Sequence, residues 1–299
     1  YLKVLKRKDF WLKLLILISI GGIYIGYQVN TIYGGDAGDL VSAIVTGGIA
    51  HPPGYPLYTL LGIILNKFIL AGTAAWRVGF LSSIPGVLTL FVLFDLLFYL
   101  TAAPIISAIS VFVLAFTYPF WLYSEVVEVF SLNNLFSVLL LWNFFHYFKE
   151  KKRKFLYAGS FILGLSLTHH HIIVFLLPVL LYLLLKTRKT FSKKLILKSL
   201  FLFLVGLIPY LYVFISAIKQ PVINWMGKPD FSSFIQLVTR STYGTFKAGA
   251  FIAHQPALRL LDIYGFWDFA LKDFRLTGVL LFIGGFIYLL KYHRSIFYP

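Results

Sequence analysis

The sequence VGFLSSIPGVLTLFVLFDLLFYL, residues 78 to 100, decides the fold class of this chain. It is apolar along nearly its whole length, its one charged residue is Asp95, and it is long enough to cross a hydrocarbon core of about 30 Å. Apolar runs recur from Leu12 to Leu290 with short polar breaks, and 59% of the 299 residues are hydrophobic while 13% are charged. The sequence therefore predicts an all-α polytopic membrane protein with a helical bundle.

The formal net charge of +16 does not indicate a nucleic-acid-binding protein. The Lys and Arg residues lie in short clusters between apolar runs instead of along one soluble face, so membrane topology explains the charge better. The chain has no Cys, which excludes disulfides and Cys-ligated metals. The lipid bilayer is thus an expected partner, and nucleic acid is not.

We expect about eight membrane spans, with one short apolar segment left out of the count. At 1.5 Å per residue, residues 57–70 reach only about 21 Å. If this segment is a surface or re-entrant helix, every basic cluster falls on the side of the basic N-terminus, which the positive-inside rule assigns to the cytoplasm. The expected spans lie roughly at residues 11–29, 78–100, 104–120, 132–148, 155–168, 172–185, 199–218 and 276–290.

This topology predicts a single transmembrane domain over residues 1–299 with two large external loops, residues 30–76 and 219–275. The candidate polar side chains then gather on the outer face, as an active site requires, and are not spread over both faces as in a transport pathway. The chain begins without Met and stops soon after an apolar run, which leaves open whether it is truncated at the C-terminus.

The segment GGDAGDL, residues 34 to 40, carries two carboxylates just outside the first apolar run. Acids at a membrane edge usually have a function, and the glycines around them allow close approach of a ligand. Asp36 or Asp39 can act as a general base on an acceptor hydroxyl, or the two together can bind a divalent cation. The alternative is structural: Asp39 caps a helix that begins after Gly38, and Asp36 is a solvated loop acid.

The segment HPPGYP, residues 51 to 56, follows in the same loop. Its three prolines preclude a regular helix through it and make it stiff. His51 is a candidate contact for an anionic donor, or else it makes a structural hydrogen bond to the backbone. Tyr55 is a candidate supporting residue.

Two later segments carry ionisable groups next to apolar runs. In WLYSEVVEVFSLN, residues 121 to 133, Glu128 is the better functional candidate, whereas Glu125 is expected to be a solvated acid at a helix start. In HHH, residues 169 to 171, successive helical side chains would point about 100° apart, so all three cannot bind one metal from a regular helix. His170 and His171 are candidates for contacting a phosphate or for bonding to an acid such as Glu128.

The second expected loop offers a further set of candidates. Arg240, with Tyr243 and Lys247, provides donors for a phosphate or pyrophosphate, and Trp225 is a supporting residue. The alternative is that these are ordinary interfacial anchors. Arg77 is a weaker phosphate candidate.

Four regions of the chain together resemble a known family. Their order and co-occurrence are similar to those of the membrane glycosyltransferases of the C superfold, and within them to the bacterial and archaeal family related to the animal O-mannosyltransferase of plexin receptors. The matching segments are GGDAGDL with AHPPGYPLY (34–40 and 50–58), FWLYSEVVEVFSLN (120–133), GLSLTHHH (164–171), and NWMGKPD with VTRSTYG (224–230 and 238–244).

The resemblance implies an inverting transferase, of the kind that performs O-mannosylation, on the extracytoplasmic side of a prokaryotic plasma membrane. It would move a sugar from a polyprenyl-phosphate donor to a hydroxyl of a protein, glycan or lipid. No cofactor is certain, and a divalent cation stays open. The role that it assigns is that of catalytic base, to Asp36 first and Asp39 second. The residues themselves suggest the other roles: donor-phosphate contacts for Arg240, Tyr243, His170, His171 and His51, and support for Glu128, Trp225 and Tyr55.

The chain departs from that family in three positions. Phe130 stands where Tyr is expected, Asp39 where Glu is common, and His171 where Thr is usual. The first change removes a hydroxyl contact, and none removes a catalytic group. A C-terminal soluble region known in relatives is absent from this sequence, which puts the choice of acceptor in doubt.

Two other classes of function remain alternatives. A transporter or flippase for a polyprenyl lipid would need polar groups through the cytoplasmic half, where the sequence offers little besides Asp95. A noncatalytic scaffold would bind a partner through its outer loops, and its outer acids would tolerate replacement.

Overall fold

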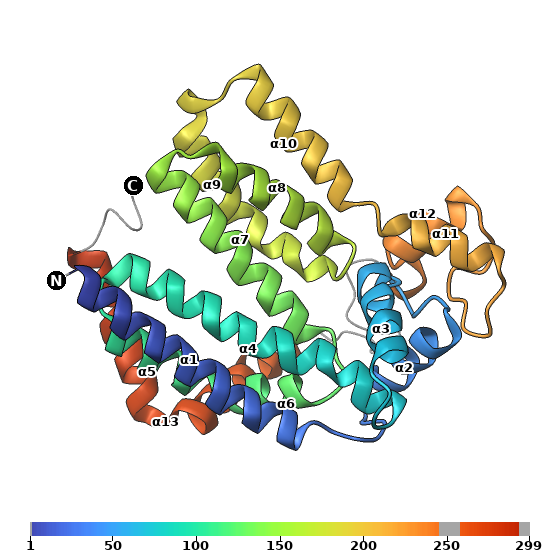
Figure 1. Ribbon diagram of the computed structural model, residues 1–299, viewed down its shortest axis with the longest axis horizontal. Helices are drawn as coiled ribbons and strands as arrows, with labels where there is room; N and C mark the ends of the chain where they lie inside the picture. The colour runs from blue at the N-terminus through green and yellow to red at the C-terminus, as the bar shows by residue number, and fades with distance from the viewer. Residues whose placement is uncertain (1, 245–257, 293–299) are drawn as a thin grey trace. The chain divides into compact units, whose positions relative to one another are not determined.

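The computed structural model of the chain describes residues 2–244 and 258–292 (Figure 1). The chain divides into two compact units, Tyr1–Thr245 and Phe246–Pro299. Within the described ranges every regular element is a helix, and the one β-type contact is an isolated parallel bridge between Ile49 and Asn224. The all-α prediction is confirmed. The single transmembrane domain over residues 1–299 stays a prediction.

Four described helical stretches are long and apolar enough to cross a membrane. They cover much of the expected spans at 11–29, 78–100, 172–185 and 199–218. A fifth candidate is a pair of helices bent by 68°, which replaces the straight span expected at 104–120. The stretches are Phe10–Tyr27 of α1 (Leu2–Tyr27), α4 (Ala74–Thr101), η1 to η2 with α9 (His171–Leu176, Leu177–Thr187, Arg188–Thr190), α10 with α11 (Lys193–Gly206, Tyr210–Ile218), and the bent pair α5 (Pro104–Ala115) and α6 (Tyr118–Glu125).

The number of eight spans is not confirmed. The helix α7 (Phe130–Glu150) forms where a span is expected, but Asn133, Asn143 and His146 make it more polar than the spanning helices. The helix α8 (Arg153–Leu167) has 15 residues and rises only about 23 Å. Both helices pack in one bundle with α4, α9 and α10 (Figure 1).

The expected first loop contains two short apolar helices, α2 (Ala37–Thr46) and α3 (Pro56–Phe68). The second coincides with the short segment predicted at 57–70. It begins at Pro56 because a proline suits the first turn of a helix, and Tyr55 before it adopts a left-handed backbone with φ of 42°. The two helices pack closely, since a Cβ at Gly62 would lie 2.3 Å from Cδ1 of Ile44.

The expected second loop is partly helical. It contains α12 (Phe231–Val238) and the short η3 (Ser241–Tyr243). In the other unit, α13 (Leu258–Tyr292) makes residues 258–274 helical. It is interrupted at Arg275, next to the expected start of the last span. The irregular part of the predicted loop is therefore shorter than expected.

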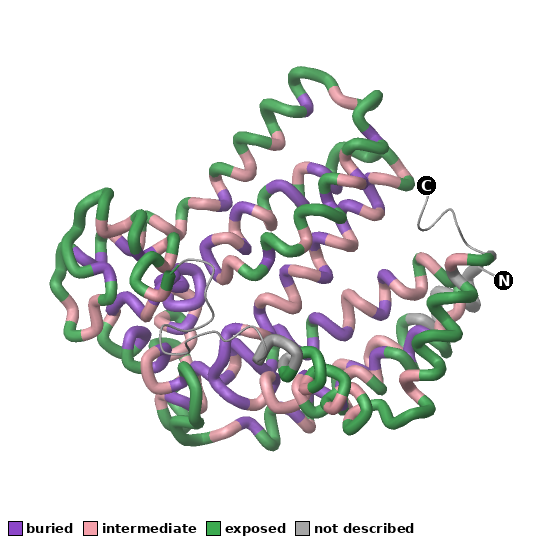
Figure 2. The backbone as a smooth tube through the Cα atoms, turned by 180° about the vertical axis from the view of Figure 1, so that it is seen from behind, coloured by how far each residue is buried: buried purple, intermediate pink, exposed green. Residues whose placement is uncertain are grey.

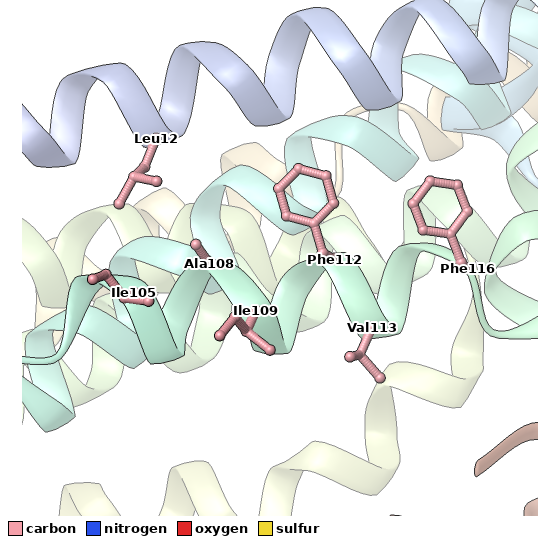
Figure 3. A pocket seen from close by; sticks show the side chains of 7 residues that line it. All are labelled: Leu12, Ile105, Ala108, Ile109, Phe112, Val113 and Phe116. Carbon is pink, nitrogen blue, oxygen red and sulfur yellow. The ribbon is translucent and has the colours of Figure 1, made fainter. Parts of the chain in front are cut away.

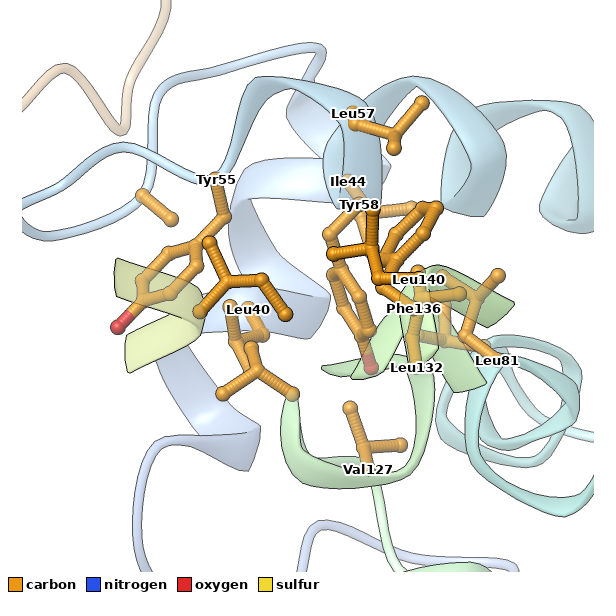
Figure 4. Close-up of a cluster of buried hydrophobic side chains, with 14 of the residues drawn as sticks. Leu40, Ile44, Tyr55, Leu57, Tyr58, Leu81, Val127, Leu132, Phe136 and Leu140 are labelled. Atoms are coloured by element: carbon orange, nitrogen blue, oxygen red, sulfur yellow. The ribbon is translucent and has the colours of Figure 1, made fainter. Parts of the chain in front are cut away.

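The largest buried cluster of the described residues extends from α2 and α3 along α7 to α8, α9 and α10, and Figure 4 shows its part around Tyr58. Tyr58 is fully buried there, among Leu132 and Phe136 of α7. By contrast, Phe201 and Leu204 of α10 are more than half exposed, as expected of a surface that faces lipid. Figure 2 shows how buried and exposed positions are distributed along the backbone. The core therefore includes the helices of the loop between the first two expected spans, whereas these two side chains of α10 lie outside it.

One large cavity, of about 560 Å³, is lined only by apolar side chains. Figure 3 shows Leu12 of α1 pointing toward α5, which contributes Ile105, Ile109 and Val113. Because no polar group lines this cavity, it offers nothing for catalysis. The chemistry of the chain lies elsewhere.

The contact between α8 and α10 supplies a stability prediction. A Cβ at Gly164 would lie 2.1 Å from the carbonyl oxygen of Phe203, so the two backbones fit only without it. We expect Gly164→Ala to lower the free energy of unfolding by about 1–3 kcal/mol, the usual cost of overpacking. Thermal unfolding in detergent measures this. Gly22→Ala is the control, since a Cβ there meets nothing within 4 Å, and equal melting temperatures for the two variants would contradict the close packing.

Candidate functional site

The two acids of GGDAGDL stand at the start of α2, but not in the predicted arrangement. The helix begins at Ala37, so Asp36 occupies the N-cap position and Asp39 lies in the first turn. The expectation that Asp39 caps the helix is wrong, because the helix starts before Gly38. The Asp36 side chain makes no capping bond and is 52% exposed, whereas that of Asp39 is 24% exposed. Asp36 therefore keeps an accessible carboxylate.

The imidazole of His51 lies between these two carboxylates. Its Nε2 is 3.3 Å from Oδ2 of Asp36, and its Nδ1 is 2.7 Å from Oδ2 of Asp39. The backbone N–H of His51 also donates to Oδ2 of Asp39, at 2.9 Å. The structure thus pairs His51 with the two acids rather than with the backbone alone. Its predicted contact with an anionic donor stays a prediction.

This arrangement shifts the pKa values of all three groups. Burial alone would lower the pKa of His51, but its hydrogen bonds to Asp36 and Asp39 and their charges outweigh burial and raise it to about 9. The hydrogen bond from His51 lowers the pKa of Asp36. Burial opposes ionisation of Asp39, yet the hydrogen bonds from His51 and Trp225 lower its pKa as well. At neutral pH the group is an imidazolium between two carboxylates.

The second loop is tied to this group by its backbone. Ile49 donates its N–H to the carbonyl of Ile223 at 2.9 Å, and Trp225 donates its N–H to the carbonyl of Ile49 at 3.3 Å. The indole N–H of Trp225 then donates to Oδ1 of Asp39 at 2.8 Å. A Cβ at Gly48 would lie 2.3 Å from the Ile223 carbonyl oxygen, which explains a glycine at this position. Trp225, predicted as support, holds the second oxygen of Asp39.

Glu128 supports the backbone of the acidic loop. Its Oε1 accepts the N–H of Asp36 at 3.1 Å, and its own backbone N–H and carbonyl both bond to the Ser82 hydroxyl. Gly35, with φ of 73°, leaves the space for it, since a Cβ there would lie 2.7 Å from Oε1. Burial raises the pKa of Glu128, and its buried Oε2 has no partner. The expectation of Glu125 as a solvated acid at a helix start is wrong, because Glu125 is the last residue of α6, is partly buried and accepts a bond from the Trp121 indole.

The three histidines have three different environments. His169 is fully buried and bonds through Nε2 to the Val129 carbonyl at 2.9 Å. His170 accepts the Ile172 N–H at Nδ1, and its ring lies 5.7 Å from that of Tyr55. His171 bonds through Nε2 to the Tyr210 hydroxyl at 3.1 Å. The expected bond to Glu128 is wrong, because among the described residues His170 bonds to Ile172 and His171 to Tyr210, while His169 bonds to the Val129 carbonyl.

Arg240 contributes a cation near the same group. Its charge lowers the pKa of Asp36 and, after the larger effects of burial and His171, that of His170. Its Nε is buried without a hydrogen-bond partner, and its guanidinium lies 5.8 Å from the centre of the Tyr243 ring. Lys247 lies outside the described residues. Arg77 is not part of the group, since its Nε donates to Asn66 at 2.9 Å.

Two residues of the site were not singled out from the sequence. Ser82 holds Glu128, and Tyr210 holds His171 by accepting its N–H while donating to the Leu167 carbonyl at 2.7 Å. Both are polar groups within expected spans, which is the signal that could have identified them. As for the possible cation, no described group of three or more His, Asp or Glu side chains has a geometry that could hold a metal ion.

Comparison with known proteins gives a consistent group of relatives. The family described as "Protein O-mannosyl-transferase TMEM260 N-terminal domain" matches residues 36–193. The chain is 32% identical to "Protein O-mannosyl-transferase TMEM260" of Mus musculus over 77% of this chain and 34% of the relative. It is 29% identical to the Dictyostelium discoideum protein of the same name over 82% of this chain and 32% of that relative. The chain thus spans about a third of their length. No solved structure matches.

The ion group predicts a pH dependence of stability. Because folding raises the His51 pKa from 6.5 to about 9, its contribution is complete below pH 6.5 and is lost as the pH rises through about 9. At about 1.4 kcal/mol per unit, this loss is on the order of 3 kcal/mol. Thermal unfolding between pH 6 and 10 should show it in the wild type and not in His51→Gln. Asp36→Asn should move the loss to lower pH, and parallel curves for wild type and His51→Gln would contradict the assignment.

Proposed function

Because the chain belongs to the family of the TMEM260 protein O-mannosyl-transferase N-terminal domain, we propose that it carries the active site of a membrane glycosyltransferase of the C superfold. The observation that carries this proposal is the half-exposed Asp36 carboxylate, held ionised beside His51 and backed by Glu128. We propose an inverting transfer from a polyprenyl-phosphate sugar to an acceptor hydroxyl of a protein or glycan, on the extracytoplasmic side of a prokaryotic membrane.

The proposed reaction begins with Asp36 as general base. Its carboxylate accepts the proton of the acceptor hydroxyl, and the oxygen attacks the anomeric carbon from the face opposite the phosphate. The bond between the sugar and the phosphate oxygen breaks, and the electron pair leaves with the polyprenyl phosphate. The proton on Asp36 then passes to solvent. The hydrogen bond from His51 lowers the pKa of Asp36, so its carboxylate is ionised at neutral pH.

Asp39 supports the reaction indirectly in this proposal. Both of its oxygens are occupied, Oδ2 by His51 and Oδ1 by Trp225, so its carboxylate is less available as a base. The order of the two acids, Asp36 before Asp39, is therefore supported by their exposure and their partners. Asp39 orients the imidazolium, which in turn orients Asp36.

The departing phosphate needs positive charge or N–H donors near the acids. Arg240 meets this need, since its buried Nε has no hydrogen-bond partner among the described residues. His170 also fits: its Nδ1 accepts the Ile172 N–H, so its neutral ring carries the proton on Nε2, which is free to donate. His171 fits less well, because it uses its Nε2–H on Tyr210 and keeps only a lone pair on Nδ1.

The rival transport function receives less support. Asp95 is the candidate acid for a polar transport pathway. Its carboxylate forms an ion pair with Lys13, at 2.5 Å, between α1 and α4. The transfer assay of the Asp36 and Asp39 variants distinguishes a noncatalytic scaffold from an enzyme.

The catalytic assignment predicts the effect of removing each acid. In vesicles that contain the chain, a polyprenyl-phosphate mannose and candidate acceptors, we expect Asp36→Asn to lower the transfer rate by roughly 10²- to 10⁴-fold, the usual contribution of a general base. Asp39→Asn should lower it less. Glu150→Gln is the control, since Glu150 pairs with His146 and Lys152 at the far end of α7. Wild-type rates in both aspartate variants would overturn the assignment.

The two neighbouring histidines predict a contrast in donor binding. His170→Ala removes a free N–H donor and should raise the KM for the lipid-linked donor by roughly tenfold, which corresponds to one lost charge-assisted hydrogen bond. His171→Ala should leave this KM within about twofold, because its N–H is already used by Tyr210. Initial rates at varied donor concentration measure both values. A larger effect of His171→Ala than of His170→Ala would contradict the proposed roles.

A further inference from the structure

A dense group of cations occupies the ends of α7, α8, α9 and α10 that lie away from Glu128. Residues 149–154 and 186–198 contain one acid, Glu150, and it is already paired with His146 at 2.7 Å and Lys152 at 2.6 Å. We call the cations of these two segments the basic collar. They are Lys149, Lys151, Lys152, Arg153, Lys154, Lys186, Arg188, Lys189, Lys193, Lys194 and Lys198.

The two segments of the basic collar are held next to each other by the fold. The Tyr147 hydroxyl near the end of α7 bonds to the Thr190 hydroxyl at 2.8 Å, and the Tyr147 ring lies 6.5 Å from that of Phe191. Lys198 of α10 lies 4.7 Å from the centre of the Tyr157 ring of α8. The cations therefore form one surface, where mutual repulsion would be relieved by an anionic ligand.

A cavity of about 490 Å³ opens within the basic collar. Lys186, Arg188 and Lys189 line it together with Tyr182 and Leu185, and these three cations are exposed. No carboxylate of the described residues forms an ion pair with any of the three. The lining thus combines three cations that have no described carboxylate partner with the apolar surfaces of Tyr182 and Leu185.

The length of α7 sets the distance between the basic collar and the Glu128 end of the bundle. The helix has 21 residues and rises about 30 Å between the Glu128 end and the basic collar, which is close to the thickness of a hydrocarbon core. Aromatic rings lie under the cations, with Lys151 4.6 Å from the Phe148 ring centre and Lys186 5.5 Å from that of Tyr182. Aromatic and basic side chains at this spacing are typical of the membrane–water interface.

We propose that the cavity lined by Lys186, Arg188 and Lys189 binds the headgroup of an anionic phospholipid. The planar guanidinium of Arg188 can bind two phosphate oxygens, and the two lysines add charge. Tyr182 and Leu185 offer an apolar surface to the first carbons of the acyl chains. That apolar wall and the position of the basic collar, about 30 Å along α7 from its Glu128 end, favour a lipid over a free phosphate ion. The proposal does not depend on the catalytic function.

Lipid titrations of the purified chain in detergent micelles test the proposal. The melting temperature is followed as phosphatidylglycerol, phosphatidylcholine or inorganic phosphate is added, which gives an apparent affinity for each. The test variant is the triple Lys186→Gln, Arg188→Gln, Lys189→Gln. The matched control removes three exposed lysines elsewhere, with Lys67→Gln, Lys219→Gln and Lys228→Gln.

We expect phosphatidylglycerol to stabilise the wild type and the control equally, and phosphatidylcholine to have little effect. The test variant should bind phosphatidylglycerol more weakly by on the order of 100-fold. If the triple variant does not fold, Arg188→Gln alone replaces it, with an expected loss of about tenfold. Equal stabilisation by inorganic phosphate or by phosphatidylcholine, or an equal loss in the control variant, would overturn the proposal.

Discussion

The imidazolium of His51 between two carboxylates is the interaction on which the candidate site depends. Two acids three residues apart would repel each other without a cation between them. His51 supplies that cation, and its backbone and ring both fix Asp39. The arrangement also divides the acids, since Asp39 is enclosed by His51 and Trp225 while Asp36 stays half-exposed. One histidine thereby makes two similar residues chemically different.

The buried core explains why that arrangement is held in place. The helices α2 and α3 are too short to be stable alone in water, and they gain their stability from packing against α7 and α4. The same packing carries Glu128 to the backbone of Asp36 and Ser82 to the backbone of Glu128. Glu128 of the bundle thus holds the backbone of the acidic loop, and Trp225 of the second loop holds its Asp39 side chain.

Composition and apolar runs were sufficient to predict the all-α class, the short helix after Tyr55, and most helix positions. They were not sufficient for the bend between α5 and α6, because it depends on packing between helices. The polarity of α7, by contrast, is visible in its sequence at Asn133, Asn143 and His146, and the expected span at 132–148 did not take it into account. In the site, the candidates Asp36, Asp39, His51, Glu128, Trp225 and Arg240 were identified from motifs, and the structure brings the first five into one hydrogen-bonded group. The pairing of each oxygen could not be predicted, since it joins residues far apart in the sequence.

The bond between the Trp225 indole and Asp39 crosses 186 positions of the chain. When the first loop has been synthesised, the two acids and His51 are present. Trp225, which bonds to Asp39, has not yet been made. The bridge from Ile49 to Asn224 must wait for the same late segment. Biosynthesis therefore separates two events, insertion of the early helices and closure of the site around its acids, and the second cannot occur until about three quarters of the present sequence has been made.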